Sequence, residues 1–547
     1  MELSSYLTVA NTLLLASPLV FLLLWRFTGR LLRLYFLRKY TTVDGLPLLG
    51  VTRDKKIQGT AVVCGGSISG ILTARVCSDH FTNVIIIDPE LTEVVRSKPS
   101  TRIAQYDSLH GYLTFVLEGM RRLWPNFDAE LRKAGGFIAS GDVKPFFGGT
   151  LMPAPHDEYA RKAQALPETM FARRPVLENV LRGLLLGGKR RANVHTVAGS
   201  VRALELAHTG GGTRVAAVVV RQADGGEITI NEPALVADCS GDSQAGLKWL
   251  RRAGVDVPPA LRLEYDQRLH YVTVTFALTE ETKMRVDAAL RAGGEPPLDS
   301  TGWLYTFVPH YNVCNEGFVL GRMDNDTMQL CCGGWGDVAL PRAPGEIEGY
   351  VASARGREPI PEWLLEVVRI LAEDGAPHFK PLKIRPCSYI RYQDAPGLPA
   401  NFVAVGDAML QLNPIYAQGC SKAMMGVVTL NALLAGSEPA KDFPVDFGHR
   451  YFREVGGHGE ALWESTKTFD YGFASTRPVK GETLDCGSFA RWYLDLFIDA
   501  ALKDSELASC MWHVRMLLAP PTDMFAPGIL WRLASRTLQS RITHTTS

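Results

Sequence analysis

A glycine-rich loop at residues 65–70 is the first group of residues whose spacing predicts chemistry. An apolar run at 60–64 precedes it and helical spacing follows, which is the strand, loop and helix order of a nucleotide site. Gly65 permits a tight turn, Ser67 must let the backbone approach a pyrophosphate, and Gly70 lets helix and strand pack closely. The helix N-terminus offers N–H groups and a favourable dipole to phosphate charge. Because serine replaces the usual second glycine, the loop alone is equally compatible with an ordinary turn.

Asp88 favours the nucleotide interpretation. It ends a second apolar run at 83–87 and lies 18 residues after Gly70. A carboxylate at that place in a βαβ unit accepts hydrogen bonds from ribose hydroxyls. The two features together predict a nucleotide site at the opening of a doubly wound sheet.

A further group of residues lies far downstream. The run at 401–405 is predicted to be a buried strand, and it leads into Gly406 and Asp407, with Pro414 and Gly419 soon after. This order can place a carboxylate on a ribityl chain and backbone N–H groups at a flavin ring. On physical grounds an ordinary strand, turn and helix is an equal alternative.

These segments resemble the class A flavoprotein monooxygenases. More narrowly, they are similar to the microbial branch that acts on secondary metabolites, related to aromatic hydroxylases and squalene epoxidase. The resemblance is at the level of motifs and covers roughly residues 59–435. It rests on GGSISGILTARVCSDHF with Asp88, the run at 174–178, ADCSGDS at 237–243 and VAVGDAMLQLNPIYAQGCSKAM from 403.

The resemblance implies which residues hold the cofactor. FAD is expected at Gly65, Ser67, Gly70 and Asp88, with Asp407 on the ribityl chain, Arg174 near the cofactor, and Pro414 and Gly419 in the loop at the flavin. Pro414, Tyr416, His110 and Gln105 are candidates for contacts near the ring. A single histidine is more often structural, and packing is an equal role for Tyr416.

The resemblance also implies a mechanism. NAD(P)H reduces the flavin, O2 adds to give a flavin hydroperoxide, and one oxygen atom passes to a lipophilic aromatic or alkene substrate, a polyketide or terpenoid. The protein excludes water and holds the substrate, so neither a side-chain nucleophile nor a metal is expected. Residues 240–243 depart from the family's central Asp-Gly pair, which leaves the reductant open. Asp242 is equally compatible with a helix N-cap.

Two other functions remain as alternatives. The first is a flavin-dependent halogenase or dehydrogenase on the same scaffold, and the second is a non-catalytic membrane protein with a vestigial nucleotide fold. Lys133 is the lysine to compare with halogenases, but neighbouring Glu130 and Arg132 favour a solvated helix end. Trp303–Pro309 lacks the paired tryptophans of halogenases, and its aromatic residues favour a core strand.

The elements that position these residues predict an α/β fold class. We expect a Rossmann-like FAD-binding domain, an inserted β-sheet substrate domain, a helical C-terminal region and an N-terminal transmembrane helix. The predicted boundaries are a membrane anchor at 1–40, a linker at 41–58, the FAD-binding domain at 59–255 and 393–435, the substrate-binding sheet at 256–392 and the helical region at 436–547.

The N-terminus predicts membrane attachment. Residues 6–25 carry no charge, and their number matches the roughly 20 residues that cross a bilayer. Arg26, Arg30 and Arg33 follow, and the positive-inside rule places them in the cytosol. We therefore expect a single-pass protein of the endoplasmic reticulum with a cytosolic catalytic domain and lipid around its N-terminal helix. A cleaved signal peptide is the alternative. Residues 511–538 are compatible with helices on a membrane surface or with ordinary packing.

Composition excludes other classes. The 547 residues are 46% hydrophobic and 21% charged, which is an ordinary globular balance. The net charge of +1 provides no field that would attract nucleic acid. The ten cysteines are scattered without a CxxC pair, so we expect reduced thiols rather than disulfides or a zinc site.

Overall fold

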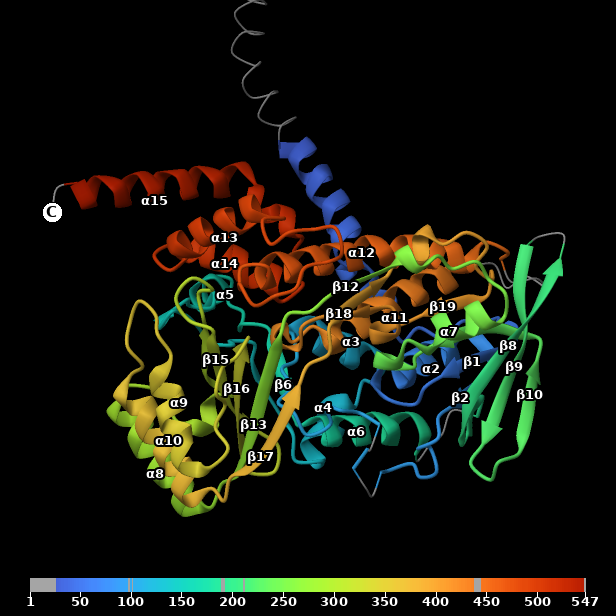
Figure 1. Ribbon diagram of the computed structural model, residues 1–547, viewed down its shortest axis with the longest axis horizontal. Coiled ribbons are helices and arrows are strands. Elements are labelled where there is room, and N and C mark those ends of the chain that lie inside the picture. Colours follow the sequence, from blue (N-terminus) through green and yellow to red (C-terminus); the bar gives the residue numbers. More distant parts are fainter. Residues whose placement is uncertain are drawn as a thin grey trace, which may run out of the picture.

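Two sheets dominate the computed structural model, which describes residues 26–96, 99–100, 102–187, 192–209, 212–436 and 444–545. A parallel sheet and a larger antiparallel sheet lie side by side, and helices from the C-terminal region lie along one side of both (Figure 1). The α/β fold class predicted from the sequence is confirmed.

The parallel sheet has five strands in the order β19-β11-β1-β2-β7, and every neighbouring pair is parallel. Its central strands are continuous apolar runs because helices cover both faces, as is usual in doubly wound sheets. The strands are β1 (Ile57–Cys64), β2 (Phe81–Ile87), β7 (Val194–Val197), β11 (Pro233–Asp238) and β19 (Phe402–Ala404).

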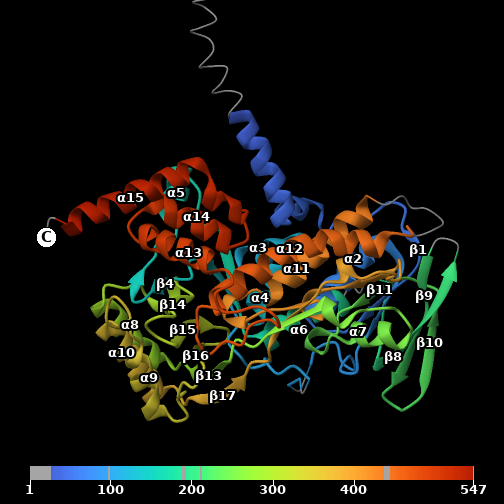
Figure 2. The same ribbon diagram turned by 45° about the horizontal axis from the view of Figure 1, so that its top comes forward.

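Helices α2 and α11 pack together beside this sheet (Figure 2). A three-stranded antiparallel sheet, β8, β9 and β10, stands beyond the parallel sheet (Figure 1). The bounds are α2 (Ile68–His80), α3 (Thr114–Leu123), α4 (Phe127–Lys133), α6 (Arg174–Leu186), α7 (Ala245–Arg252), α11 (Gly419–Ala435), β8 (Gly199–Thr209), β9 (Gly212–Gln222) and β10 (Glu227–Asn231).

The second large sheet has seven strands in the order β17-β13-β16-β15-β14-β4-β5. Strand β13 alternates: Val272, Val274 and Phe276 are buried in the cluster formed with helices α8, α9 and α10, while Tyr271 faces the other side. The bounds are β13 (Leu269–Ala277), β14 (Trp303–Val308), β15 (Glu316–Met323), β16 (Thr327–Trp335), β17 (His378–Lys383), α8 (Glu280–Ala292), α9 (Ile347–Ser353) and α10 (Glu362–Asp374).

Part of this sheet comes from outside the predicted range of 256–392. Strands β4 (Pro145–Phe147) and β5 (Thr150–Leu151) extend it beside β14, and β4 runs parallel to β14. The sequence does not reveal these strands, because each is only two or three residues long. The segment between helices α4 and α6 therefore contributes both to the part of the molecule built on the parallel sheet and to the part built on the seven-stranded sheet.

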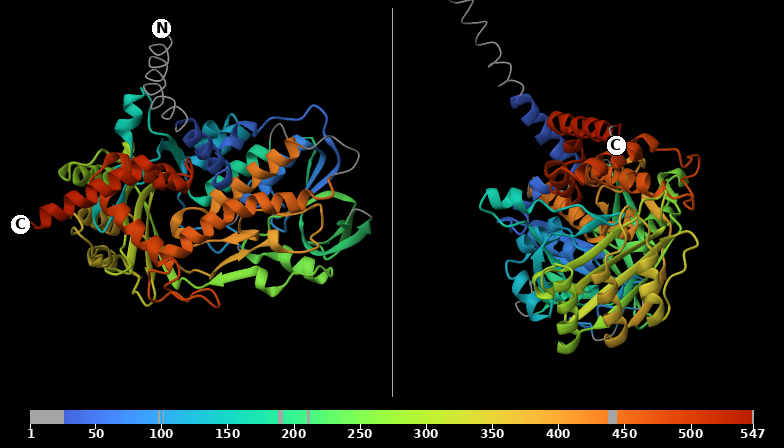
Figure 3. Two further views of the ribbon diagram at one scale, coloured as in Figure 1. Left: turned by 90° about the horizontal axis from the view of Figure 1, so that it is seen from above. Right: turned by 90° about the vertical axis from the view of Figure 1, so that its left-hand side faces the viewer.

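The C-terminal helices gather on one side of the molecule (Figure 3). The remaining elements belong to neither of the two large sheets. They are β3 (Phe137–Ser140), β6 (Glu168–Phe171), β12 (Arg262–Tyr265), β18 (Cys387–Ile390), β20 (Leu410–Gln411), α5 (His156–Arg161), α12 (Phe447–Asp470), α13 (Ser488–Ala501), α14 (Ser505–Arg515) and α15 (Pro527–Thr545). Of the two tryptophans in residues 511–538, Trp512 is buried and donates a hydrogen bond to the carbonyl of Gly141, while Trp531 is 75% exposed.

The structure contradicts the predicted single-pass membrane location in the endoplasmic reticulum. In the described ranges, no helix is long and apolar enough to cross a bilayer. The helical residues described at 26–40 carry several basic side chains, whereas a span needs about 20 largely apolar residues. One of these basic residues, Arg33, pairs with Asp523 at 2.9 Å, which holds the helix against the C-terminal region. The predicted span, residues 6–25, lies outside the described residues.

The sequence predicts a linker at 41–58, but the structure packs much of this segment. Leu46 and Leu49 are buried in the main core. A Cβ atom added to Gly45 would lie only 2.6 Å from Val428 of α11. The burial of these apolar side chains fixes the segment against the parallel sheet domain. All ten cysteines have free thiols, as predicted, and six of them are buried.

Candidate functional site

A cavity of about 440 Å³ lies where the carboxyl ends of the parallel strands meet the seven-stranded sheet. Ligands of open α/β sheets bind at this edge, and the volume is in the usual range for small-molecule sites. Nearly all the predicted cofactor residues line it, namely Gly65, Ser67, Asp88, Arg174, Asp407, Pro414 and Gly419. Gly70 is the one that lies behind the wall.

The glycine loop between β1 and α2 has the backbone geometry of a phosphate site. Gly65 has a φ of +129°, a conformation that a side chain would strain. A Cβ atom on Gly70 would overlap the carbonyl oxygen of Gly65, so only glycine permits this close approach of helix and loop. The N-terminus of α2 thus points its first N–H groups toward the cavity. This loop fits the pyrophosphate of a dinucleotide such as FAD.

Asp88 ends β2 and faces this loop. Its two carboxylate oxygens accept hydrogen bonds from the backbone N–H groups of Gly66 and Glu90, each at 2.8 Å. A carboxylate has about four acceptor positions, so both oxygens keep capacity for ribose hydroxyls. The contact with Gly66 also ties the second strand to the phosphate loop.

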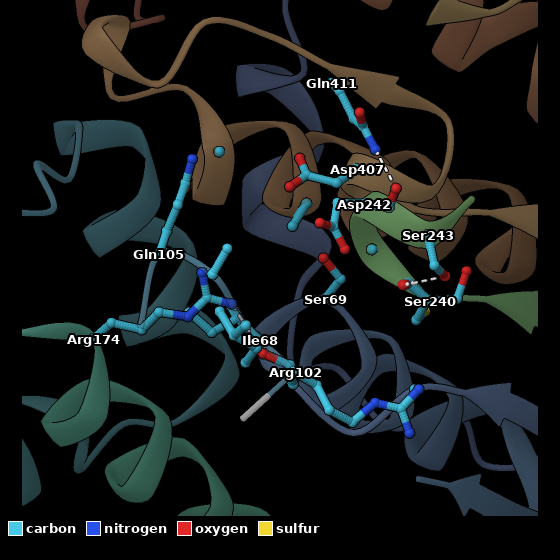
Figure 4. Close-up of a pocket in the computed structure, with 18 of the residues that line it drawn as sticks. Ile68, Ser69, Arg102, Gln105, Arg174, Ser240, Asp242, Ser243, Asp407 and Gln411 are labelled. Atoms are coloured by element: carbon cyan, nitrogen blue, oxygen red, sulfur yellow. Dashed lines mark hydrogen bonds between the residues drawn. The ribbon is translucent and has the colours of Figure 1, made fainter. Parts of the chain in front are cut away.

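Arg174 begins α6 and reaches the same loop from another side (Figure 4). It donates to the hydroxyl of Ser67 at 3.1 Å, and Ser67 donates to Glu178 at 3.0 Å. Glu178 is only 1% exposed and is paired with Arg96 at 3.2 Å. The serine that replaces the usual glycine is therefore part of a polar network, which fixes Arg174 beside the cavity.

Asp407 lies across the cavity from Arg174, in the 3₁₀ turn Gly406–Ala408 (Figure 4). One of its carboxylate oxygens accepts from Lys422 of α11 at 2.8 Å, and Lys422 also donates to the carbonyl of Leu410 at 2.7 Å. Lys422 is buried, whereas the Asp407 side chain remains 45% exposed. The charge pair thus presents a carboxylate to the cavity at the place predicted for the ribityl chain.

The segment 413–417, which we call the ring-end loop, closes the opposite end of the cavity. Pro414 opens a 3₁₀ turn, and Ala417 takes the left-handed conformation with a φ of 57°. The side chain of Asn413 caps the turn by accepting from the N–H of Ile415 at 3.1 Å. Helix α11 starts two residues later at Gly419. The loop and the start of the helix thus both border the cavity.

Three of the four ring candidates line the cavity, and Pro414 of the ring-end loop is one of them. His110 and Gln105 line the cavity, but Tyr416 does not. Its ring packs edge-on against Phe469, and its hydroxyl donates to Asp470 at 3.3 Å. The packing role is the one that the structure gives Tyr416.

His110 is held as a neutral imidazole. Its Nδ1 lies 2.8 Å from the carbonyl oxygen of Ser108, and that contact requires a proton on Nδ1. Burial, followed by the nearby positive charge of Arg174, lowers the pKa of His110 to about 4. Nε2 is then an acceptor at neutral pH.

Asp242 is not the N-cap of a helix. It lies in the 3₁₀ turn Gly241–Ser243 and pairs with Arg385 at 3.0 Å. The start of α7 is instead satisfied by Asp238, which accepts from the N–H of Gly246 at 2.8 Å. Asp238 also accepts from Ser240 at 2.9 Å, and burial raises its pKa to about 6. Asp238 stands in the motif ADCSGDS at the end of the buried strand β11, but its contact with the start of α7 could not be read from the motif.

The end of the cavity nearest the seven-stranded sheet is lined by apolar side chains together with charged ones, Lys383 and Arg385. The hydroxyl of Tyr271 donates to Ser108 at 3.0 Å, and the N–H of Leu109 donates to Thr273 at 3.1 Å. These bonds fasten the segment that carries His110 to strand β13. The apolar lining consists of Leu109, Leu382, Ile384, Leu412 and Pro414. Neither β17 nor the Ile384 segment carries a motif, so these residues could not be found from the sequence.

Lys133 lies outside the cavity. Its side chain is 80% exposed at the end of α4, and its ion partner is Glu130 at 4.0 Å. The solvated helix end favoured by the sequence is what the structure shows. Trp303, Tyr305 and Phe307 of β14 are buried, as expected for a core strand.

Comparisons of the sequence with protein-family models and with curated proteins found no match. Solved structures with a similar fold do exist. The flavin-dependent brominase Bmp2 aligns with a TM-score of 0.54 and 13% identity over 88% of this chain and 100% of that one. A flavoprotein/dehydrogenase from Cytophaga hutchinsonii aligns with a TM-score of 0.53 and 13% identity over 90% and 100%. A variant of Klebsiella pneumoniae HpxO complexed with FAD gives 0.50 and 12% over 84% and 99%. The chain therefore shares the fold of these three solved proteins, in line with the α/β fold class that its motifs predicted.

Proposed function

We propose that this protein is a FAD-dependent monooxygenase that hydroxylates or epoxidises a lipophilic aromatic or alkene metabolite of the polyketide or terpenoid class. The observation that carries the proposal is the continuity of one cavity. Its polar end holds the glycine loop, Asp88 and Asp407, and its other end is lined by apolar side chains such as Leu382 and Ile384. A cofactor and a lipophilic substrate can thus meet in one continuous cavity.

The overall reaction balances with NAD(P)H as the reductant. One atom of O2 enters the substrate, and the other leaves as water, which takes two electrons and one proton from NAD(P)H as a hydride equivalent and a second proton from solvent. FAD, when bound, supplies the activation of oxygen. The chain contributes binding: the N-terminus of α2 for the pyrophosphate, Asp88 for the ribose and Asp407 for the ribityl hydroxyls.

The apolar end has two tasks. Its side chains exclude water from the reacting centre, and the shape of the wall orients the substrate. His110 adds one polar contact, because its neutral Nε2 accepts a hydrogen bond from a substrate hydroxyl. This histidine lies on the segment that Tyr271 and Thr273 fasten to the substrate sheet.

Halogenation is the rival reaction on this fold, as the similarity to a brominase makes clear. It requires halide in addition to O2 and reduced flavin. Lys133, the lysine singled out for comparison with halogenases, is exposed and outside the cavity. The geometry thus favours oxygen transfer.

Purified protein tests the proposal directly. We expect a yellow preparation with flavin absorbance, and consumption of NAD(P)H and O2 that rises when polyketides or terpenoids are added. The product should be heavier by one oxygen atom, with label from ¹⁸O2. Colourless protein that rejects FAD would overturn every flavin function, including the dehydrogenase. A brominated product formed only with bromide would instead establish a halogenase, and substrate oxidation without label from ¹⁸O2 would establish a dehydrogenase.

A further inference from the structure

Helix α12 ends at a carboxylate, Asp470, that is completely buried behind the ring-end loop. We propose that Asp470 is a positioning residue that holds the ring-end loop in the conformation that receives the flavin. The inference rests on the proposed function, because it concerns the same site. Asp470 does not line the cavity itself, so it acts through the residues that it holds.

Four side chains donate hydrogen bonds to this one carboxylate. Asn413 donates to Oδ1 at 2.9 Å, and Tyr265 donates to Oδ2 at 2.9 Å. Trp335 and Tyr416 both donate to Oδ1 at 3.3 Å. Buried carboxylates are tolerated when their oxygens are satisfied in this way.

The donors come from parts of the chain that are far apart. Tyr265 ends β12, and Trp335 ends β16 of the seven-stranded sheet. Asn413 and Tyr416 belong to the ring-end loop. Asp470 therefore connects helix α12, the seven-stranded sheet and the ring-end loop through hydrogen bonds to one carboxylate. A displacement of any one of these elements changes the hydrogen bonds that hold the other two.

The bond to Asn413 has a specific consequence for the loop. An amide side chain has one donor end and one acceptor end. With its nitrogen held by Asp470, Asn413 must turn its oxygen toward the N–H of Ile415, and this bond caps the turn that starts at Pro414. Without Asp470 the amide has no fixed orientation, and the cap is lost. A second link, from Thr466 of α12 to Gln418, holds the far end of the loop at 3.4 Å.

The burial of Asp470 is costly for stability, which argues against a purely structural purpose. Within the described part of the chain no basic side chain forms an ion pair with it, and burial raises its pKa to about 6. An apolar side chain would fill such a position at lower free energy. What the carboxylate provides, and an apolar residue cannot, is four acceptor positions in a fixed arrangement.

Hydrogen exchange of the loop in flavin-free protein tests the proposal. For Asp470→Ala we expect amide exchange in residues 411–418 to accelerate at least tenfold, and FAD affinity to fall at least tenfold. Asp470→Asn keeps the size and one acceptor oxygen, so it should preserve most of the protection. The matched control is Asp504→Asn, which alters another buried carboxylate of the C-terminal helices that caps α14 and pairs with Arg536. This control should leave exchange in 411–418 unchanged.

Unchanged exchange in folded Asp470→Ala would overturn the proposal. If that variant does not fold, Asn413→Ala removes the same link from the loop side, and unchanged exchange there would overturn it equally. Exchange is measured without flavin, so this readout is independent of the proposed function. Failure of the wild-type protein to bind FAD would rule out the monooxygenase function. Loop exchange that does not change when Asp470 is replaced would rule out only the positioning role of Asp470.

Discussion

The glycine loop and the ring-end loop close the two ends of one cavity, but they are held in different ways. The glycine loop takes its shape from residues close in sequence: Gly65 and Gly70 approach each other directly, and Asp88 at the end of the next strand binds Gly66. The ring-end loop takes its shape from Asp470, which lies 57 residues beyond Asn413. Because the constraints on the glycine loop are mainly local, that loop can be recognised as a sequence motif. The conformation of the ring-end loop depends instead on the assembly of elements that are distant in the sequence. The variants below test that difference.

Gly70→Ala should have the largest effect. The added Cβ would overlap the Gly65 carbonyl, and the obstacle is backbone that cannot rotate away. Helix α2 must then move off the loop, so we expect at least a 100-fold loss of FAD affinity and a fall in Tm of several degrees. Flavin titration and thermal unfolding measure both quantities.

Gly183→Ala is the matched control, because it also places a methyl group on a helical glycine. Nothing lies within 4 Å of the added atom, so Tm should stay the same or rise slightly. Wild-type FAD affinity in Gly70→Ala would show that the loop does not need the close approach of helix and backbone.

Asp407→Ala should have the next largest effect. It removes a carboxylate from the cavity and leaves the buried Lys422 without its ion partner. Hydrogen bonds to charged groups contribute about 1.5–3 kcal/mol, which corresponds to a loss of roughly 10- to 100-fold in FAD affinity. Asp407→Asn should lose less, because its amide oxygen still accepts. Equilibrium flavin binding distinguishes the two.

The control for Asp407 is Asp374→Ala on α10. Asp374 is also a partly exposed carboxylate in an ion pair, here with Arg285, but it is not part of the cavity wall. Its removal should leave the flavin content unaltered. Equal flavin loss in both variants would mean that general destabilisation explains the result.

Much of the fold was accessible from the sequence because its signals are local. The apolar runs at 60–64 and 83–87 and the helical spacing after the first run predicted the opening of the parallel sheet, and β1, β2 and α2 confirm it. Strands β4 and β5 were missed because two or three residues leave no periodicity to detect. The predicted membrane span falls on residues 6–25, outside the described residues, and no described helix can replace it.

The residues of the candidate site likewise divide into those that have a local sequence signal and those that have none. Gly65, Ser67, Asp88 and Asp407 follow strands and carry motif spacing, so they could be found in advance. Asp470 could not be found, because nothing in its neighbourhood marks it. Its role depends on four donors that only the tertiary structure brings together. Tyr416 shows the converse, since its place in a motif suggested a ring contact while long-range packing turned it toward Asp470.

The titration of Asp238 should have a smaller effect, which appears in the pH dependence of protein stability. Burial raises its pKa from 3.8 to about 6, so the folded state binds the proton more tightly than the unfolded chain. Its contribution to stability is therefore fully present below about pH 4 and is lost as the pH rises through about 6. One pKa unit corresponds to about 1.4 kcal/mol, so the change is roughly 3 kcal/mol.

Asp238→Asn removes this titration. The Tm of wild type minus the Tm of the variant should fall by a few degrees as the pH rises from 4 to 7. Subtracting the variant cancels the titration of the other groups. A difference that stays constant over this range would show that Asp238 titrates normally in the folded state.

Lys133→Ala should have the smallest effect, and it separates the two reactions that this fold supports. Lys133 contacts neither end of the cavity, and its weak pairing with Glu130 on an exposed helix end is worth less than about 1 kcal/mol. Flavin content, Tm and the rate of oxygen transfer should remain within twofold of wild type, as measured by absorbance, thermal unfolding and product formation. If product formation were lost while flavin content and NAD(P)H oxidation persisted, an exposed lysine would be required for chemistry that oxygen transfer does not explain. A halogenase mechanism that uses Lys133 would then be the better account, because the cofactor end of the cavity would be intact and only the final transfer would have failed.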